Sequence, residues 1–231
     1  MTGGRGVDFA GVHIQNLKRS GEGGPVGTSV MSVFRLSACA APIALLLAGC
    51  AALPGGGPAP LDTYDLKASA PQAAGANRPR TQVLVAEPSA LKALDGENIV
   101  IRPAAGSIEF LGGAQWADRL PRVVQARLVE ALQATGRLGG VGKPGEGLAI
   151  DYQVVTEIRA FEVRLDGAPR AEVALYVKLL NDRNGVVRAA RGFSAFAPLG
   201  PGAGNDAYVA ALDRAFAQVV QELVPWVLGA V

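Results

Sequence analysis

The chain has 231 residues, of which 49% are hydrophobic and 18% charged, and its formal net charge is +2. The first 49 residues hold four of the 22 basic and two of the 20 acidic side chains, so residues 50–231 carry 18 of each. A balanced charge provides no basic field that could hold a nucleic acid through its phosphates, and we expect no nucleic-acid partner.

Histidine and cysteine are confined to the first 50 residues. His13 is the one histidine, and Cys39 and Cys50 are the two cysteines. Residues 51–231 therefore cannot form a zinc site of the usual nitrogen and sulfur type, a disulfide, or a nucleophile paired with histidine. We expect no metal and no cofactor.

An apolar run from Leu36 to Leu47 follows Arg35 and ends in the sequence Leu47-Ala48-Gly49-Cys50. A basic residue, a short apolar run and small residues before a cleavage point are the parts of a secretory signal. About a dozen apolar residues are too few to span a bilayer, which takes roughly 20. The alternative, a short buried helix that happens to end in Ala-Gly-Cys, fits these flanks less well. We interpret residues 1–49 as a signal region that is removed, with Met31 as the true start.

The last four residues of this run look like a bacterial lipobox, in which the cysteine thiol receives a diacylglycerol and becomes the new N-terminus. Cys50 is thus predicted to carry diacylglycerol and an acyl chain. The Ala, Gly and Pro-rich sequence after it cannot bury apolar surface, so residues 50–62 are expected to form a tether. We assign residues 63–231 to a single periplasmic α/β domain.

Several short strands are predicted first in this domain. Residues 63–68 alternate apolar and polar side chains, and residues 81–88 form a second candidate strand that Pro88 ends. Residues 98–103 and 107–112 are expected to form a hairpin.

The period then changes to that of a helix. Leu120, Val124, Leu128 and Leu132 recur every four residues, which is typical of an amphipathic helix. Asp118 is the expected N-cap, Pro121 falls in the first turn and Gly136 can close the C-terminus. The glycines that follow, up to Gly142, are interpreted as a turn because Lys143 precedes a proline.

From Leu148 the apolar residues again recur at every second position, which is typical of a β-strand. A phase shift predicts a β-bulge near Ile158 to Ala160, and turns at Asp166-Gly167 and Asn184-Gly185 predict a meander of three antiparallel strands.

A second amphipathic helix follows, with its cap at Asn205 or Asp206. We expect two main amphipathic helices on one face of a mixed, largely antiparallel sheet, which is a two-layer α/β fold.

Catalysis would have to depend on carboxylate pairs, lysine or tyrosine. Asp151 with Glu157, and Glu109 with Asp118, are the candidate pairs, but their spacing places neither pair in a common pocket. We interpret them as solvated surface acids and expect no enzymatic activity.

The two tryptophans are the other candidate site residues. Trp116, before the first helix, is either a partner or lipid contact or a core residue beneath the helix, and the core interpretation is favoured. Trp226 is placed after the last helical turn, where it could contact lipid or a partner, although coverage by its own domain is favoured.

Several short stretches stand together in a recognisable order: Cys50, Tyr64 and Leu66, Val83 to Val85, Gln115 to Pro121, Asp151 to Val154, Phe161-Glu162 and Asn184-Gly185. Taken together, these features resemble the ABC-type transport auxiliary lipoproteins (PqiC-like). In that family a further proline follows Tyr-x-Leu, whereas here the next proline is Pro71, so the resemblance does not define the pairing of the first strand.

The resemblance implies a non-catalytic, membrane-anchored lipoprotein that serves an ABC permease and an MCE-type substrate-binding protein in lipid transport between membranes. Ala51 is not the aspartate associated with inner-membrane retention, so the periplasmic face of the outer membrane is expected, with the inner membrane as the alternative. The sequence also permits a lipoprotein that docks on and regulates a periplasmic enzyme such as a cell-wall synthase, and it permits a homo-oligomer.

Overall fold

The structure, a computed structural model, describes residues 60–67 and 76–231. The predicted signal region, Cys50 and most of the predicted tether lie outside the described residues. The described chain forms a nine-stranded mixed sheet and two helices. In chain order these elements are β1 (Asp62–Tyr64), β2 (Arg78–Val85), β3 (Ser89–Ala90), β4 (Asn98–Arg102), β5 (Glu109–Trp116), α2 (Leu120–Ala134), β6 (Leu138–Gly142), β7 (Tyr152–Arg164), β8 (Arg170–Asn181), β9 (Val187–Pro198) and α3 (Asn205–Ala230).

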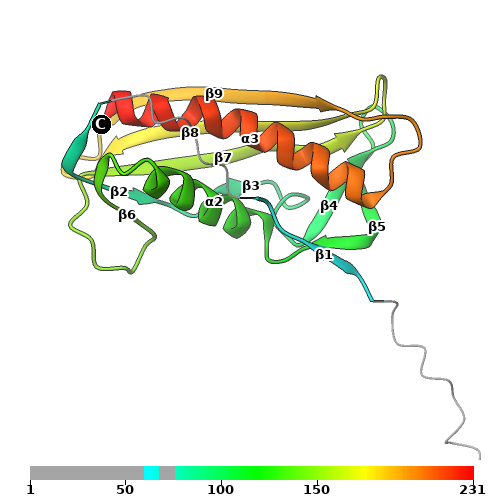
Figure 1. Cartoon of the computed structure of the whole chain (residues 1–231), viewed down its shortest axis with the longest axis horizontal. Helices are drawn as coiled ribbons and strands as arrows, with labels where there is room; N and C mark the ends of the chain where they lie inside the picture. The colour runs from blue at the N-terminus through cyan, green and yellow to red at the C-terminus, as the bar shows by residue number, and fades with distance from the viewer. Residues whose placement is uncertain (1–59, 68–75) are drawn as a thin grey trace, which may run out of the picture. The chain divides into compact units, whose positions relative to one another are not determined.

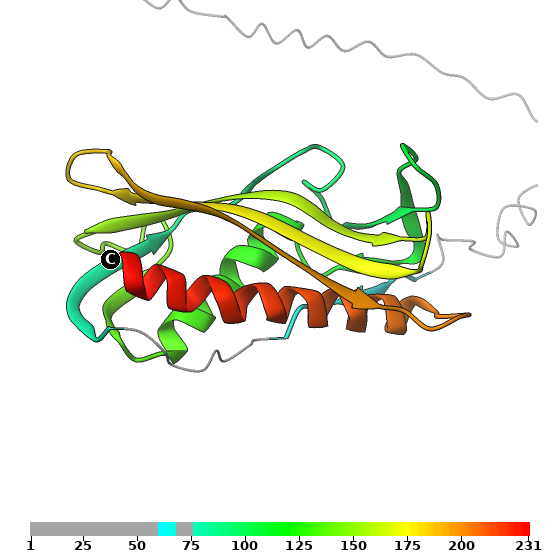
Figure 2. The same ribbon diagram turned by 90° about the horizontal axis from the view of Figure 1, so that it is seen from above.

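Both described helices cover the same face of the sheet, as Figure 1 and Figure 2 show, and neither of them lies on the other face. The two longest pairings, β7 with β8 and β8 with β9, are antiparallel, whereas the parallel pairings are short. The two-layer α/β fold with two helices on one face is therefore confirmed.

Strand β7 organises the sheet. One of its edges pairs with β8 along its whole length, and the other edge is shared by three short strands in succession, β2, β3 and β4, all parallel to β7. Strand β6 extends the sheet beyond β2, while β5 and β1 extend it beyond β4. The sheet consequently divides into two arms on one side of β7.

The predicted bulge in β7 is confirmed. The register between β7 and β8 shifts between Ile158 and Ala160. The extra residue moves Phe161 onto the face covered by the helices, where its ring meets Trp116 at 5.7 Å and Phe216 at 5.9 Å between centroids. The bulge thus keeps the second half of this long strand in phase with the core.

Helix α2 forms where the four-residue spacing predicts it, but the N-cap prediction is wrong. Arg119 occupies the N-cap position, with no side-chain capping bond. The Asp118 carboxylate instead accepts a 2.7 Å hydrogen bond from the Arg119 N–H, and the Leu120 N–H bonds the Gly96 carbonyl at 2.9 Å. Gly136, at φ 61°, takes the left-handed conformation that follows a helix C-terminus.

Helix α3 also begins differently from the prediction. Its N-cap is Gly204, and neither Asn205 nor Asp206 caps it. Asn205 donates to the Gly112 carbonyl at 3.1 Å and Asp206 accepts a 2.6 Å bond from the Tyr64 hydroxyl, so both side chains tie the helix start to the strands β5 and β1. This hydrogen bond raises the pKa of Tyr64 to about 12.

The prediction that Trp226 follows the last helical turn of α3 is also wrong. The helix continues through Pro225 to Ala230, so Trp226 lies within it rather than after it. Pro225 removes one backbone donor, but Val227 and Leu228 beyond it are fully buried. Packing of this last turn outweighs the missing hydrogen bond.

The glycine-rich segment after α2 is a strand, and the prediction of a turn there is wrong. Residues Leu138–Gly142 pair in parallel with β2. A Cβ atom on Gly139 would lie 2.5 Å from the Pro79 carbonyl oxygen, so the two backbones approach more closely than any side chain would allow. The turn itself starts only at Lys143.

Candidate functional site

The sequence-predicted site residues do not form one site. Cys50 lies outside the described residues. Trp116 is 1% exposed and stands edge-on to Phe161, so its side chain belongs to the core between sheet and helices and presents no surface. Trp226 is half-buried, and its ring meets Phe193 of β9 at 5.4 Å.

Asp151 and Glu157, two of the candidate acids, are held by separate partners. The Asp151 carboxylate accepts a 3.0 Å bond from the Gln82 N–H and a 2.8 Å bond from Arg183, and these hold the pKa of Asp151 below its ordinary value. Glu157 instead pairs with Arg159 at 3.2 Å on the exposed surface.

Across residues 60–67 and 76–231, no three acidic, histidine or cysteine side chains gather closely enough to hold a metal ion. None of the described helices is long and apolar enough to span a membrane.

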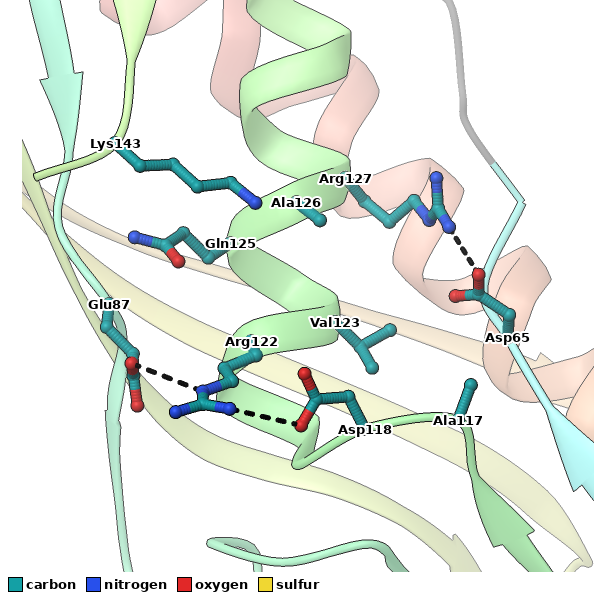
Figure 3. Close-up of a pocket in the computed structure, with 10 residues that line it drawn as sticks. All are labelled: Asp65, Glu87, Ala117, Asp118, Arg122, Val123, Gln125, Ala126, Arg127 and Lys143. Atoms are coloured by element: carbon teal, nitrogen blue, oxygen red, sulfur yellow. Dashed lines mark hydrogen bonds and ion pairs between the residues drawn. The ribbon is translucent and has the colours of Figure 1, made fainter. Parts of the chain in front are cut away.

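A groove of about 350 Å³ runs along the solvent side of α2 (Figure 3). Its walls come from helix α2, the segment between β5 and α2, the chain after β1, and the residues that follow β2 and β6. The lining residues are Asp65, Glu87, Ala117, Asp118, Arg122, Val123, Gln125, Ala126, Arg127 and Lys143.

Ion pairs at one end of the α2 groove link the helix to the chain just after β2. Arg122 lies 3.8 Å from Glu87 and 3.7 Å from Asp118, the latter one helical turn away. Arg119, just outside the groove, pairs with Asp95 and with Glu87, and the hydrogen bond to Asp95 raises its pKa. These arginines are half-exposed, so the pairs contribute little to stability and can exchange partners.

The other end of the α2 groove is more enclosed. Arg127 pairs with Asp65 and with Glu130 at 2.5 Å, while its Nε is buried and has no hydrogen-bond partner among the described residues. Burial lowers the pKa of Arg127, but the bonds to Glu130 and Asp65 outweigh that effect and raise it. Gln125 ties helix α2 to β2, because its side-chain amide donates a 2.9 Å hydrogen bond to the Val85 carbonyl.

Lys143 extends into the α2 groove toward the helix (Figure 3). In the part of the chain that the structure describes, its backbone N–H bonds Glu146 but no carboxylate pairs with its amine. The groove therefore offers a free cation beside exchangeable ion pairs, which suits the docking of a polar protein surface. Reasoning from sequence did not identify it. The spacing of Asp118 with Arg122 and of Arg127 with Glu130 was an available signal for a charged helix face.

Comparisons with known proteins agree with this fold. The model of the family described as ABC-type transport auxiliary lipoprotein component matches residues 64–224. An uncharacterised protein of Bradyrhizobium diazoefficiens is 32% identical over 190 residues, which are 80% of this chain and 50% of that protein. The chain thus spans about half the length of that curated relative.

Two crystal structures share the architecture. A protein from Xanthomonas campestris is 30% identical, with a TM-score of 0.65 over 72% of this chain and 94% of that one. An uncharacterised protein matches with a TM-score of 0.57 at 19% identity, over 73% of this chain and 99% of its own. The second likeness concerns the fold alone.

Proposed function

Since the chain belongs to the family of ABC-type transport auxiliary lipoprotein components, we propose that it serves an ABC transport system as a non-catalytic, lipid-anchored accessory. The observation that carries this proposal is the family match over residues 64–224. The transported cargo is proposed to be lipid moving between the two membranes, and the partners to be an ABC permease and an MCE-type substrate-binding protein.

The anchor in this proposal is Cys50. Two or three acyl chains, at about 0.8 kcal/mol per buried methylene, would make dissociation from the bilayer negligible. The domain would then search for its partners within a thin layer at the membrane. Ala51 supports the periplasmic face of the outer membrane as the location.

The α2 groove is the proposed contact with the transport partners. An acidic side chain of a partner could pair with the free Lys143 amine, and Arg122 could exchange Glu87 or Asp118 for a partner carboxylate without leaving a buried charge. Charge pairs of this kind give specificity and a fast association more than they give affinity.

The test is crosslinking in cells with a photoreactive residue at Ala126, in the α2 groove. We expect crosslinks to a permease or an MCE-type protein, and we expect Lys143→Glu to reduce them several-fold. Lys92→Glu, an exposed lysine outside the groove, is the matched control and should leave them unchanged.

Cys50→Ser checks the anchor separately. It should move the protein from the membrane to the soluble fraction, and mass spectrometry of the parent protein should find the thiol carrying lipid. Crosslinks from Ala126 to a cell-wall synthase, with none to transport components, would replace the proposal with the regulatory alternative.

A further inference from the structure

Two rows of side chains cross the open face of the sheet at the end where β1 begins. The strand registers place Phe110, Val100, Glu162, Glu172 and Phe196 side by side on five neighbouring strands. Because neighbours in register point to the same face, and Phe161 next to Glu162 faces the helices, this row lies on the face without helices.

The second row lies two residues further along each strand. It places Arg102 beside Arg164 and Arg164 beside Arg170, followed by Pro198 at the sheet edge. We call Arg102, Arg164 and Arg170 the arginine row.

Three carboxylates prevent the arginine row from repelling itself. Glu162 forms an ion pair with Arg102, with 2.6 Å between the nearest nitrogen and oxygen, and Glu172 forms one with Arg164 at 3.5 Å. Asp166 also pairs with Arg164. The side chain of Glu162 is 4% exposed, whereas the three arginines are 27–33% exposed. The acids therefore lie below and the guanidinium groups lie above them, nearer to solvent.

Large apolar side chains flank the arginine row. Phe110 is 51% exposed, Phe196 is 50% exposed and Ile108, just before β5, is 45% exposed. The Arg170 guanidinium stands 5.5 Å from the centre of the Phe196 ring. Exposed aromatic rings beside arginines, on a face that neither described helix covers, are an arrangement found where proteins touch the water–lipid boundary.

The chain also enters the domain at this end. Strand β1 runs parallel to β5 with Asp62 opposite Ala114, so Pro60 lies near the level of Gly112, two residues from Phe110. Figure 1 shows β1, β4 and β5 at the end of the domain where α3 begins. Ten residue steps separate Pro60 from Cys50, a reach of at most about 36 Å. Any lipid on Cys50 therefore lies within that distance of this end.

We propose that this end of the sheet rests on the bilayer that holds the Cys50 anchor, with Phe110, Phe196 and Ile108 in the headgroup layer and the arginine row against lipid phosphates. The inference rests on the anchor in the proposed function but adds an orientation to it. The positive charges of the three arginines are balanced by the negative charges of Glu162, Glu172 and Asp166. Glu109 adds a further exposed negative charge at this end. Insertion of the apolar side chains therefore contributes more to membrane contact than long-range attraction between charges. Contact should hence occur on neutral as well as anionic vesicles.

The experiment uses the lipidated protein in vesicles of phosphatidylcholine, with or without phosphatidylglycerol, that carry a nitroxide on the headgroup. The chain from Cys50 onward has no other cysteine, so single fluorophores can be attached through Ala168→Cys or Val186→Cys. These sites lie in the loops at opposite ends of β8, about 40 Å apart for 12 residues. We expect at least twofold stronger quenching at position 168 than at 186 in both kinds of vesicle.

A double variant, Phe110→Ser with Phe196→Ser, should reduce the quenching at 168 to the level at 186. The matched control, Leu91→Ser with Val187→Ser, removes exposed apolar side chains elsewhere and should leave it unchanged. Circular dichroism establishes that each variant is folded.

Equal quenching at 168 and 186 in vesicle-bound protein would overturn the orientation and leave the anchor intact. Quenching that persists in the double variant, or that needs phosphatidylglycerol, would also overturn it. Protein that does not remain with the vesicles indicates instead that the anchor in the proposed function is wrong.

Discussion

Arg102 donates a 2.6 Å hydrogen bond from Nε to Oε1 of Glu162, a carboxylate that is almost fully buried on a sheet face without helices. The second cation near Glu162 is Arg164, whose Nη1 lies 3.9 Å away. The position of this carboxylate therefore depends mainly on Arg102.

Arg102→Leu is expected to lower the free energy of unfolding by about 1–3 kcal/mol, because it leaves the buried Glu162 carboxylate without its closest donor. Urea denaturation measures the change. Arg159→Leu is the matched control, since its pair with Glu157 is exposed on both sides and should contribute at most about 1 kcal/mol. If Arg102→Leu lowers the free energy of unfolding no more than the control does, Arg164 alone is a sufficient partner for the Glu162 carboxylate.

Gly139→Ala should destabilise the protein by roughly 1–3 kcal/mol, because the new Cβ would meet the Pro79 carbonyl oxygen at 2.5 Å and force β6 away from β2. Thermal unfolding followed by circular dichroism measures it. At Gly140 the nearest atoms would be 3.5 Å away, on the side chains of Gln82 and Leu148, so Gly140→Ala should have little effect. Equal losses at both positions would contradict the pairing of β6 described above.

Trp116→Ala should cost about 3–5 kcal/mol, since it empties a fully buried site that also contacts Phe161. Trp226→Ala should cost less, because Trp226 is only half-buried. Urea denaturation of the two variants gives the comparison. If Trp116→Ala unfolds like the parent protein but loses partner crosslinks, the side chain acts at a surface and its position in the core is incorrect.

The lowered pKa of Asp151 should make the stability of the protein depend on pH. The Gln82 N–H and then Arg183 hold the folded-state pKa of Asp151 below its ordinary value. A depressed pKa stabilises the fold above the unfolded-state value and loses that contribution as pH falls through the folded-state value. Compared with Asp151→Asn, the parent protein should therefore be more stable at neutral pH, by roughly 1 kcal/mol, with the difference shrinking below about pH 4.

Urea denaturation from neutral to acidic pH measures this dependence. Glu157→Gln, at an exposed ion pair, serves as the control for charge removal at the surface. A difference between parent and Asp151→Asn that does not vary with pH would show that the carboxylate charge plays no part.

Local pattern alone was sufficient for much of this fold. The four-residue spacing that begins at Leu120 predicted α2, period two predicted the meander, and the phase change at Ile158 to Ala160 predicted the bulge. These features succeed because a helix or a long two-sided strand must place its apolar side chains at the period of its own backbone. The signal is present in the segment itself.

The features decided by tertiary structure each depend on a partner distant in sequence. The segment Leu138–Gly142 is a strand because β2 pairs with it, and Asp206 bonds Tyr64 instead of capping its own helix. The same holds for the α2 groove and the arginine row, whose members come from separate strands and loops. A glycine or a charged residue carries no apolar period of its own, so only the chain packed against it determines whether it becomes a strand, an ion pair or a surface.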